Sequence, residues 1–431
     1  MNEYDSNRIL DLTKKIKYEK TKNLNEADCY ILNTCHIREK AREKVYHDIG
    51  RLKKEFRNKP KPIVLITGCV AQAEGTILLK KERYIDAVLG PQSYHQINET
   101  ILKLEKKLKP INITEFDVIE KFDYLNSLKN TDNKVSSFLT IQEGCDKFCK
   151  FCVVPYTRGA EYSRSIKELV FEANQLVRNG ARELILLGQN VNAYNFQGIK
   201  LSNLILEISK IKDLKRIRYT TSHPKDFTED LIKVHKKCEK LMPLIHLPVQ
   251  SGSNKILEAM NRKHTVKEYL EVINKLIKVK PEIKFSSDFI IGYPGETNDD
   301  FNNTIELVTK IGFINSFSFI FSARPGTPAY HLVKVDDVEA RNRLIKFQRI
   351  ARDIKTSYRK KLMEKTAKVL FENKMKIGNK YFGRDEYFNS VIVDSEEDLT
   401  GKIKNVKILE GNQSTLYGEI ASNLDKTNYA A

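Results

Sequence analysis

Three closely spaced cysteines are the residues of this chain that most directly indicate chemistry. Cys145, Cys149 and Cys152 form a Cys-x3-Cys-x2-Cys motif that directly follows an apolar stretch at residues 138–141. Cubane iron–sulfur clusters are held by cysteine thiolates and normally take four of them, so a loop with three leaves one iron open. An enzyme can place its reagent on that iron. The motif therefore predicts an iron–sulfur site with a free coordination position.

Zinc binding and core packing are the competing interpretations of these thiols. A zinc knuckle needs a fourth Cys or His at short range, but the flanking residues 133–165 contain no His and no further Cys. Buried structural thiols do not account for Gly144, Pro155 and Gly159, which punctuate the same segment. We favour the cluster. The spacing, with Phe151 before the last cysteine, resembles the radical S-adenosylmethionine (SAM) superfamily, which implies that SAM chelates the open iron.

Length, composition and charge set the outer limits of the fold and function. The 431 residues suggest two or three domains, and 41% hydrophobic residues suffice for sizeable cores. No run approaches the roughly 18 apolar residues of a membrane span, and the amino terminus has no apolar signal core. Seven cysteines in such a chain fit a reducing compartment. We therefore expect a cytoplasmic protein that does not bind membranes.

The net charge of +18 points toward a polyanionic partner, because Lys and Arg that neutralise phosphates provide most non-specific affinity for nucleic acid. A solvated, Lys-rich surface is the alternative interpretation.

The elements that must position the cysteines are strand-like runs that alternate with amphipathic helical segments. This βα pattern predicts a parallel sheet or barrel. Each run is followed by a polar or glycine-bearing loop, and such loops share one rim, where parallel barrels gather catalytic groups. Six strands predict an incomplete barrel, open on one side to a large substrate. The runs are residues 138–141, 184–187, 217–220, 244–247, 285–291 and 317–321.

Loops on this rim supply the candidate cofactor-binding residues. Within the radical SAM resemblance, residues 188–190 take the place of the loop that meets the amino end of SAM. Residues 250–251 are candidates to contact the polar groups of SAM. Two positions of the run 285–291 are candidates to contact its adenosyl half. A plain turn is the alternative for each loop, because turns require Gly, Pro, Asn and Ser anyway. The candidates are Gly188, Gln189, Asn190, Gln250, Ser251, Asp288 and Ile290.

The amino-terminal residues 1–115 also alternate helix and strand, and two apolar runs there end in Cys35 and Cys69. Thiols at matching strand ends predict a second metal site, because carboxyl strand ends collect function in α/β sheets; burial in the core is the alternative for either thiol alone. Cys29 and Cys238 we interpret as structural. A cluster with an open position needs three thiolates, and no strand precedes the first helical pattern. We therefore expect the native chain to extend upstream of Met1.

The carboxyl-terminal part predicts an RNA-binding module. Residues 337–362 show the period of an amphipathic helix, with Arg341, Arg343, Lys346, Arg349, Arg352 and Arg359 between the apolar positions. Four short strand-like runs follow, at residues 367–371, 390–393, 401–409 and 414–420. They predict a compact barrel that resembles a TRAM domain, since small basic barrels commonly bind RNA. A merely structural cap is the alternative.

Seven motifs spread over the whole chain closely resemble the MiaB-type tRNA methylthiotransferases. This resemblance implies a flavodoxin-like, apparently truncated α/β domain (1–115), a radical SAM partial (βα)6 barrel (131–362) and a TRAM β-barrel (363–428). It also implies two [4Fe-4S] clusters, one that binds SAM through Cys145, Cys149 and Cys152, and an auxiliary one through Cys35, Cys69 and a Cys absent from this chain. The motifs are residues 2–6, 32–41, 68–72, 152–159, 188–194, 246–253 and 288–297.

The activity that the resemblance implies is conversion of N6-(dimethylallyl)adenosine at position 37 of tRNA to its 2-methylthio derivative. Carbon 2 of adenine resists ordinary nucleophiles, so a radical from SAM is the kind of chemistry that a cofactor supplies. The expected partners are tRNA, an electron donor such as flavodoxin or ferredoxin, and a sulfur donor; we expect a monomer. The alternatives are the same chemistry on threonylcarbamoyl-adenosine or on a ribosomal protein, and a non-catalytic iron–sulfur RNA-binding protein.

Overall fold

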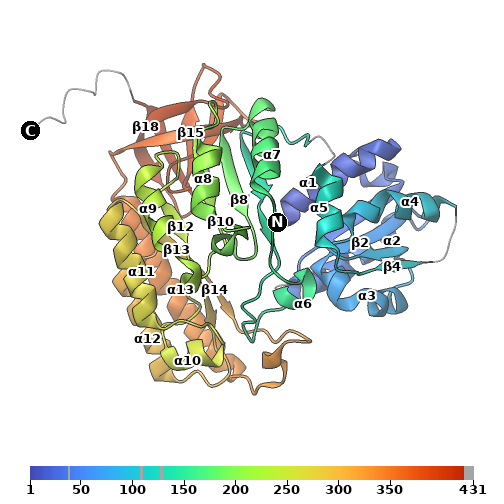
Figure 1. The fold of residues 1–431 in the computed structure, drawn as a ribbon, viewed down its shortest axis with the longest axis horizontal. Helices are drawn as coiled ribbons and strands as arrows, with labels where there is room; N and C mark the ends of the chain where they lie inside the picture. The colour runs from blue at the N-terminus through green and yellow to red at the C-terminus, as the bar shows by residue number, and fades with distance from the viewer. Residues whose placement is uncertain (37–38, 107–109, 127–129, 422–431) are drawn as a thin grey trace, which may run out of the picture.

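The computed structural model describes residues 1–36, 39–106, 110–126 and 130–421. The chain folds into an amino-terminal α/β sheet, a central partial barrel and a small closed β-barrel, as Figure 1 shows. The mixed α/β architecture predicted from the alternating runs is confirmed. Residues 422–428, the expected end of the TRAM barrel, lie outside the described residues.

The amino-terminal sheet has four parallel strands in the order β1-β2-β3-β4. One apolar core joins the sheet to α1, α4 and α5, and a second joins it to α2 and α3. Both faces are therefore covered, which is why these strands read as continuous apolar runs. The strands are β1 (Cys29–Thr34), β2 (Ile63–Gly68), β3 (Ala87–Leu89) and β4 (Ile111–Ile113). The helices are α1 (Asn2–Thr13), α2 (Glu39–Glu55), α3 (Cys69–Lys81), α4 (Ile97–Glu105) and α5 (Val118–Asn126).

The central part is an incomplete barrel of six parallel strands. It consists of the sheets β11-β8-β5 and β12-β13-β14, which are linked by a parallel bridge between Ile217 and Leu241. All six strands predicted from the apolar runs are present. The edges at β5 and β14 do not pair with each other, so the barrel is open there. The strands are β5 (Ser136–Thr140), β8 (Glu183–Leu187), β11 (Arg216–Tyr219), β12 (Leu244–His246), β13 (Lys284–Ile291) and β14 (Asn315–Ile320).

Amphipathic helices cover the outer face of the barrel, and their apolar sides form the largest core of the molecule. Several begin at a capping side chain: Thr265 and Thr297 each accept a hydrogen bond from the backbone N–H three residues on, which satisfies an otherwise unpaired donor. The covering helices are α7 (Ile166–Arg178), α8 (Leu201–Ser209), α9 (Glu229–Lys237), α11 (Val266–Val279) and α12 (Asn298–Ile311). Two shorter helices lie apart from this core: α6 (Val154–Arg158) contacts α3, and α10 (Asn254–Ala259) belongs to a smaller apolar cluster. Two short hairpins pair β6 (Gln142–Glu143) with β7 (Tyr162–Ser163) and β9 (Asn195–Phe196) with β10 (Ile199–Lys200).

A long helix, α13 (Asp337–Lys360), packs along β14 and leads into the closed barrel β15-β16-β17-β19-β18. The four expected strands are present, and β16 is an additional strand that lacks an apolar run. Arg216 and Arg218 of β11 fix this barrel in place, because their guanidinium groups donate hydrogen bonds to its backbone carbonyls. Its strands are β15 (Thr366–Lys374), β16 (Lys380–Arg384), β17 (Ser390–Asp394), β18 (Ile403–Gly411) and β19 (Thr415–Ile420).

Helix length and polarity bear on membrane contact. Among the described residues, no helix combines the length and the apolar content that crossing a bilayer requires.

Candidate functional site

The three cysteines lie on one loop between β6 and α6, which we call the cysteine loop (residues 144–153). Its ends are closed by a backbone hydrogen bond of 3.1 Å from Cys145 N to Gly159 O, and Cys152 N donates to Cys149 O at 2.9 Å. Gly144 has φ +77°, and a Cβ there would lie 1.8 Å from the carbonyl oxygen of Ala160. Only glycine fits this close approach, so the sequence fixes where the loop turns.

The three thiols of the cysteine loop are close enough to influence one another. Burial, together with smaller contributions from the neighbouring Cys149 and Cys145, raises the pKa of Cys152 to about 12. Burial likewise raises the pKa of Cys145 to about 12. Thiols held this way carry their protons until a metal displaces them. Among the described residues, no three Cys, His, Asp or Glu side chains gather as ligands of a single ion.

A cavity of about 160 Å³ opens beside Cys152 at the carboxyl ends of the barrel strands. Three of the predicted SAM-binding residues, Gln250, Asp288 and Ile290, line it together with Cys152. Asp288 also faces His246, with 3.5 Å between Oδ2 and Nε2. The cavity thus combines a thiol, a carboxylate, an amide and apolar walls. Cysteine thiolates are the ligands that iron–sulfur clusters take, and the carboxylate and amide beside Cys152 can form hydrogen bonds with a polar ligand.

Gln250 occupies a strained backbone conformation in that cavity wall. Its φ is +77°, a left-handed value that non-glycine residues rarely adopt. The backbone is held there by hydrogen bonds of 3.0 Å from Gln250 N to Asp288 O and from Ile290 N to Gln250 O. Strain of this kind persists only where surrounding structure enforces it, and it concentrates at functional sites.

The loop 188–190 is tied to the start of the cysteine loop and does not line the Cys152 cavity. The amide oxygen of Gln142 accepts hydrogen bonds from Gln189 N and Asn190 N at 3.0 and 3.1 Å. The side chain of Gln189 in turn accepts one from Gly144 N at 2.8 Å. At Gly188 a Cβ would lie 2.7 Å from the Gln142 amide oxygen. This loop therefore holds the backbone at the start of the cysteine loop in place.

Asn190 also joins a polar cluster at the barrel mouth. Its side-chain amide donates to Asp226 at 2.7 Å and to Glu161 at 3.2 Å. Lys147 of the cysteine loop pairs with Asp226 at 2.8 Å. Burial raises the pKa of Glu161. Sequence reasoning did not find Glu161 and Asp226, because neither belongs to a motif with recognisable spacing.

Ser251 lies next to the cavity but is turned away from it. Its hydroxyl contacts Thr304 Oγ1 at 3.3 Å and accepts from Ser253 N at 3.2 Å. It shapes the turn that follows Gln250. Cys238 is buried in the main core and Cys29 packs at the edge of the amino-terminal core, which agrees with structural roles for both.

Cys35 and Cys69 directly follow neighbouring strands in matching register, since Thr34 of β1 pairs with Gly68 of β2. Gly68 has φ +88°, and a Cβ there would lie 2.4 Å from Thr34 O. The glycine thus lets the two strand ends, and with them the two cysteines, come close. Thr34 Oγ1 accepts from Val70 N at 3.3 Å and locks the two ends together.

A buried charge network connects the amino-terminal sheet to the cysteine loop. Arg158, at the end of α6, pairs with Asp5 of α1 at 2.9 Å and lies 3.4 Å from Glu143. Lys121 of α5 pairs with Glu143 at 2.6 Å. All four side chains are almost completely buried. Burial lowers the pKa of Arg158, but the charge of Asp5 opposes this effect and the pKa lies well above its ordinary value.

Comparisons with known proteins show which families the chain resembles. Residues 139–308 match the Radical SAM superfamily, and residues 1–90 match a family described as Uncharacterized protein family UPF0004. The radical S-adenosylmethionine methyltransferase TsrM of Kitasatospora setae, solved with tryptophan substrate and a SAM analogue, aligns with a TM-score of 0.53 at 14% identity. The alignment covers 74% of this chain and 66% of that one. Fold and motif together define a radical SAM protein.

Curated relatives are similar over nearly the full length. The tRNA-2-methylthio-N(6)-dimethylallyladenosine synthase of Pelagibacter ubique (strain HTCC1062) is 58% identical over 430 residues, which cover 99% of this chain and 96% of the relative. The protein of the same name from Wolbachia pipientis subsp. Culex pipiens (strain wPip) is 48% identical and covers 97% of each chain. This chain belongs to the family of the tRNA-2-methylthio-N(6)-dimethylallyladenosine synthases.

Proposed function

We propose that this chain is a radical SAM methylthiotransferase that converts N6-(dimethylallyl)adenosine at position 37 of tRNA to its 2-methylthio derivative. The observation that carries this proposal within the family is the cavity that Cys152 shares with Gln250 and Asp288. It offers thiolate ligands for a cluster and polar groups for SAM at the same barrel rim. When bound, the [4Fe-4S] cluster and SAM supply the one-electron chemistry that carbon 2 of adenine requires.

The proposed ligands follow from the placement of the thiols. Cys145, Cys149 and Cys152 hold the SAM-binding cluster. Cys35 and Cys69 hold the auxiliary cluster. The buried charge network connects the two cluster sites and keeps them in a fixed relative position, because a charge network without solvent contact permits few alternative arrangements.

Within the cavity, the side chains of this chain bind and orient SAM. Asp288 is placed to accept hydrogen bonds from hydroxyl or amino groups, and Gln250 to donate and accept through its amide. Phe319, Phe321 and Ile290 form apolar walls that limit access of water. A water-poor cavity protects a reactive species from side reactions.

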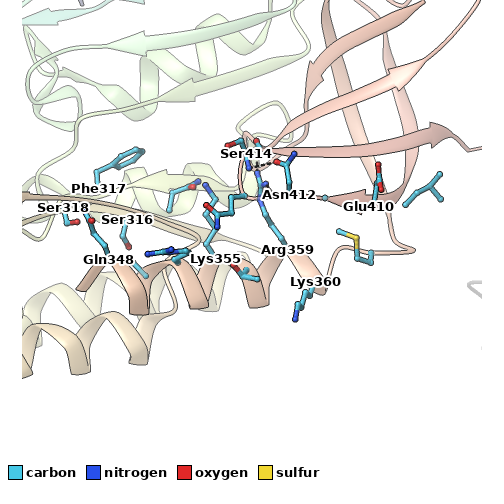
Figure 2. A pocket seen from close by; sticks show the side chains of 18 of the residues that line it. Ser316, Phe317, Ser318, Gln348, Lys355, Arg359, Lys360, Glu410, Asn412 and Ser414 are labelled. Atoms are coloured by element: carbon cyan, nitrogen blue, oxygen red, sulfur yellow. Dashed lines mark hydrogen bonds between the residues drawn. The ribbon is translucent and has the colours of Figure 1, made fainter. Parts of the chain in front are cut away.

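The open side of the barrel leads to a larger groove, drawn in Figure 2, which we call the basic groove (lining residues 315–319, 348–363 and 409–414). It has a volume of about 870 Å³ and lies between β14, α13 and the turn that joins β18 to β19. Within the range 348–363, the residues that line it are Gln348, Ala351, Arg352, Lys355, Thr356, Arg359, Lys360 and Met363. Phe319 lines both this groove and the Cys152 cavity. The two spaces therefore share a wall at the open edge of the barrel.

The basic groove has the chemistry of an RNA-binding surface. Arg352, Lys355 and Lys360 of α13 line it, with Glu410 as its one acidic lining residue among those described. Phe317 is 51% exposed there and offers a face on which a base can stack. We propose that RNA phosphates next to the target nucleotide bind along α13, while the unpaired target base reaches past Phe319 into the cavity.

Two of the six basic residues expected on this helix have other roles. Arg343 is buried and pairs with Glu296 at 2.9 Å. Arg359 is buried and donates hydrogen bonds to the carbonyls of Asn412 and Ser414, which attaches the β18–β19 turn to α13. The periodicity of the sequence predicts a basic helix, but it does not reveal which of its arginines meet an internal partner.

The remaining partners belong to the same proposal. We infer a monomeric, cytoplasmic enzyme that receives electrons from a flavodoxin or ferredoxin and sulfur from a separate donor. The family membership supports tRNA as substrate, and the net charge of +18 is of the sign that tRNA binding requires.

Nucleoside mass spectrometry tests this function. tRNA from a strain that lacks the gene is incubated anaerobically with the reconstituted, reduced protein and SAM. Formation of 2-methylthio-N6-(dimethylallyl)adenosine together with 5′-deoxyadenosine supports the proposal. Formation of a methylthio group on threonylcarbamoyl-adenosine, or 5′-deoxyadenosine without any RNA product, overturns the substrate assignment.

A further inference from the structure

We propose that Arg262 is a positioning residue that holds Cys149 and makes the SAM-binding cluster easier to reduce; this inference rests on the proposed cluster at the cysteine loop. Arg262 lies in the turn between α10 and α11, far from the cysteines in sequence. Its Nη1 donates to the Sγ of Cys149 at 3.5 Å, and its Nη2 donates to Pro248 O at 2.6 Å.

The turn that carries Arg262 is built against the cysteine loop. Lys150 N donates to Met260 O at 3.0 Å, and the side chain of Asn261 donates to Phe148 O at 2.9 Å. Asn261 and Lys263, on either side of Arg262, have φ of +58° and +59°. Two left-handed positions within three residues are costly for residues other than glycine. The turn is held in this strained conformation, which directs the side chain of Arg262 toward Cys149.

The charge of Arg262 has no carboxylate partner. The side chain is 5% exposed, and among the described residues no Asp or Glu oxygen lies within 4 Å of its guanidinium. The imidazoles near it, His223 and His264, bring no negative charge. A buried cation without an anion is strongly unfavourable. When an iron–sulfur cluster is bound at the cysteine loop, its thiolates supply the negative charge that the guanidinium of Arg262 otherwise lacks.

The cation has a defined effect on the redox equilibrium. Three thiolates around a [4Fe-4S]²⁺ core give a net negative charge, and reduction to [4Fe-4S]⁺ adds one electron from an external one-electron donor. A nearby positive charge stabilises the more negative, reduced state. Charge and hydrogen bonds to the sulfurs are among the factors that set cluster potentials. Arg262 therefore raises the midpoint potential.

An anaerobic redox titration followed by electron paramagnetic resonance tests this role without SAM or RNA. The Cys35→Ala, Cys69→Ala background leaves one cluster to titrate. In this background Arg262→Met is expected to lower the ratio of reduced to oxidised cluster about tenfold at a fixed potential, which is about 59 mV for one electron. Arg262→Lys keeps the charge and should recover most of the difference.

Lys263→Met is the matched control, because it removes an exposed positive charge from the same turn. It should change the ratio less than about twofold, since water and salt screen an exposed charge. An unchanged midpoint potential in an Arg262→Met protein with a full iron content would overturn the proposal.

Thermal unfolding of the iron-free protein provides a second readout. Arg262→Met should unfold at a higher temperature than the parent, because it removes a buried charge that lacks an anion when no cluster is bound. A purely structural role predicts the opposite shift and no change in potential. Because neither measurement uses tRNA, a wrong tRNA product would count against the proposed function alone, and the absence of any iron–sulfur cluster would count against both.

Discussion

The carboxylate of Asp5 accepts a hydrogen bond from the guanidinium of Arg158, with 2.9 Å between Asp5 Oδ2 and Arg158 Nη2. The contact joins the first helix of the amino-terminal unit to the helix that ends the cysteine loop. In Figure 1 both helices lie on the side of the amino-terminal unit that faces the barrel. Together with Lys121 and Glu143, Asp5 and Arg158 form a buried charge network. The relative position of the two cysteine sites therefore depends on buried charges.

Asp5→Asn should destabilise the protein by about 3–5 kcal/mol, because breaking a buried pair leaves Arg158 and Lys121 with one carboxylate in place of two. Denaturant unfolding of the iron-free protein measures the change. Glu3→Gln on the same helix is the control. Glu3 pairs with Lys134 at an exposed position, and its loss should cost no more than about 0.5 kcal/mol. Equal effects of the two substitutions would contradict the network's role.

His235 should make stability fall in mildly acidic solution. Its Nε2 lies 2.7 Å from Tyr219 Oη, and burial lowers its pKa from 6.5 to about 3, helped by the charge of Lys280. Between these values the unfolded chain binds a proton that the native protein does not, so the free energy of unfolding decreases as pH falls from about 6.5 to about 3. The slope from this group reaches at most about 1.4 kcal/mol per pH unit.

His235→Gln should flatten this part of the stability curve, measured by denaturant unfolding between pH 5 and 7. His331 is exposed, and His331→Gln should leave the curve as it is. A curve for His235→Gln that still parallels the parent would show that other groups cause the acid sensitivity.

Gln250 should show opposite effects on stability and on ligand binding. Gln250→Gly relieves the left-handed strain and should raise stability by about 1 kcal/mol, whereas Gln250→Ala keeps the strain. Both remove the amide from the cavity, so both should weaken SAM binding to the reconstituted protein about tenfold or more, as equilibrium binding would show. Full SAM affinity in both variants would remove Gln250 from the site.

The basic groove should respond to charge removal in a salt-dependent way. Arg352→Gln and Lys355→Gln should each weaken binding of an anticodon stem-loop RNA, and each should reduce the slope of log affinity against log salt by about 1. Fluorescence anisotropy at several salt concentrations measures both quantities. Lys278→Gln on α11, an exposed cation outside the groove, should leave the slope unchanged. An equal decrease in all three variants would indicate only a general charge effect.

Phe317 should contribute to RNA binding by stacking and not by charge. Phe317→Ala should cost about 1–3 kcal/mol of RNA affinity without a change in the salt slope. Phe317→Tyr retains an aromatic face and should bind as the parent does. If the Ala variant binds RNA normally, the exposed ring packs only against His246, which it already contacts edge to face at 6.0 Å between ring centroids.

The sequence by itself determined the six strands of the central barrel, the cysteine spacing and the family. An apolar run such as 285–291 is buried in any fold of the chain, and a loop such as 144–153 necessarily follows the strand that precedes it in the sequence. The order of residues along the chain was therefore sufficient to predict these features. The strand β16 was missed because Lys380–Arg384 offers no apolar run and forms only when its neighbours pair with it.

Only the tertiary structure decided which distant side chains serve the site. Arg262 contacts Cys149 from 113 residues away in the sequence, and Arg359, which lines the groove, uses its guanidinium to hold the β18–β19 turn. Ser251, adjacent to Gln250, lies outside the cavity for the same reason. Charge and hydrogen-bonding partners are set by three-dimensional proximity, which residue spacing encodes only within a single element, so these roles became visible only once the elements were packed together.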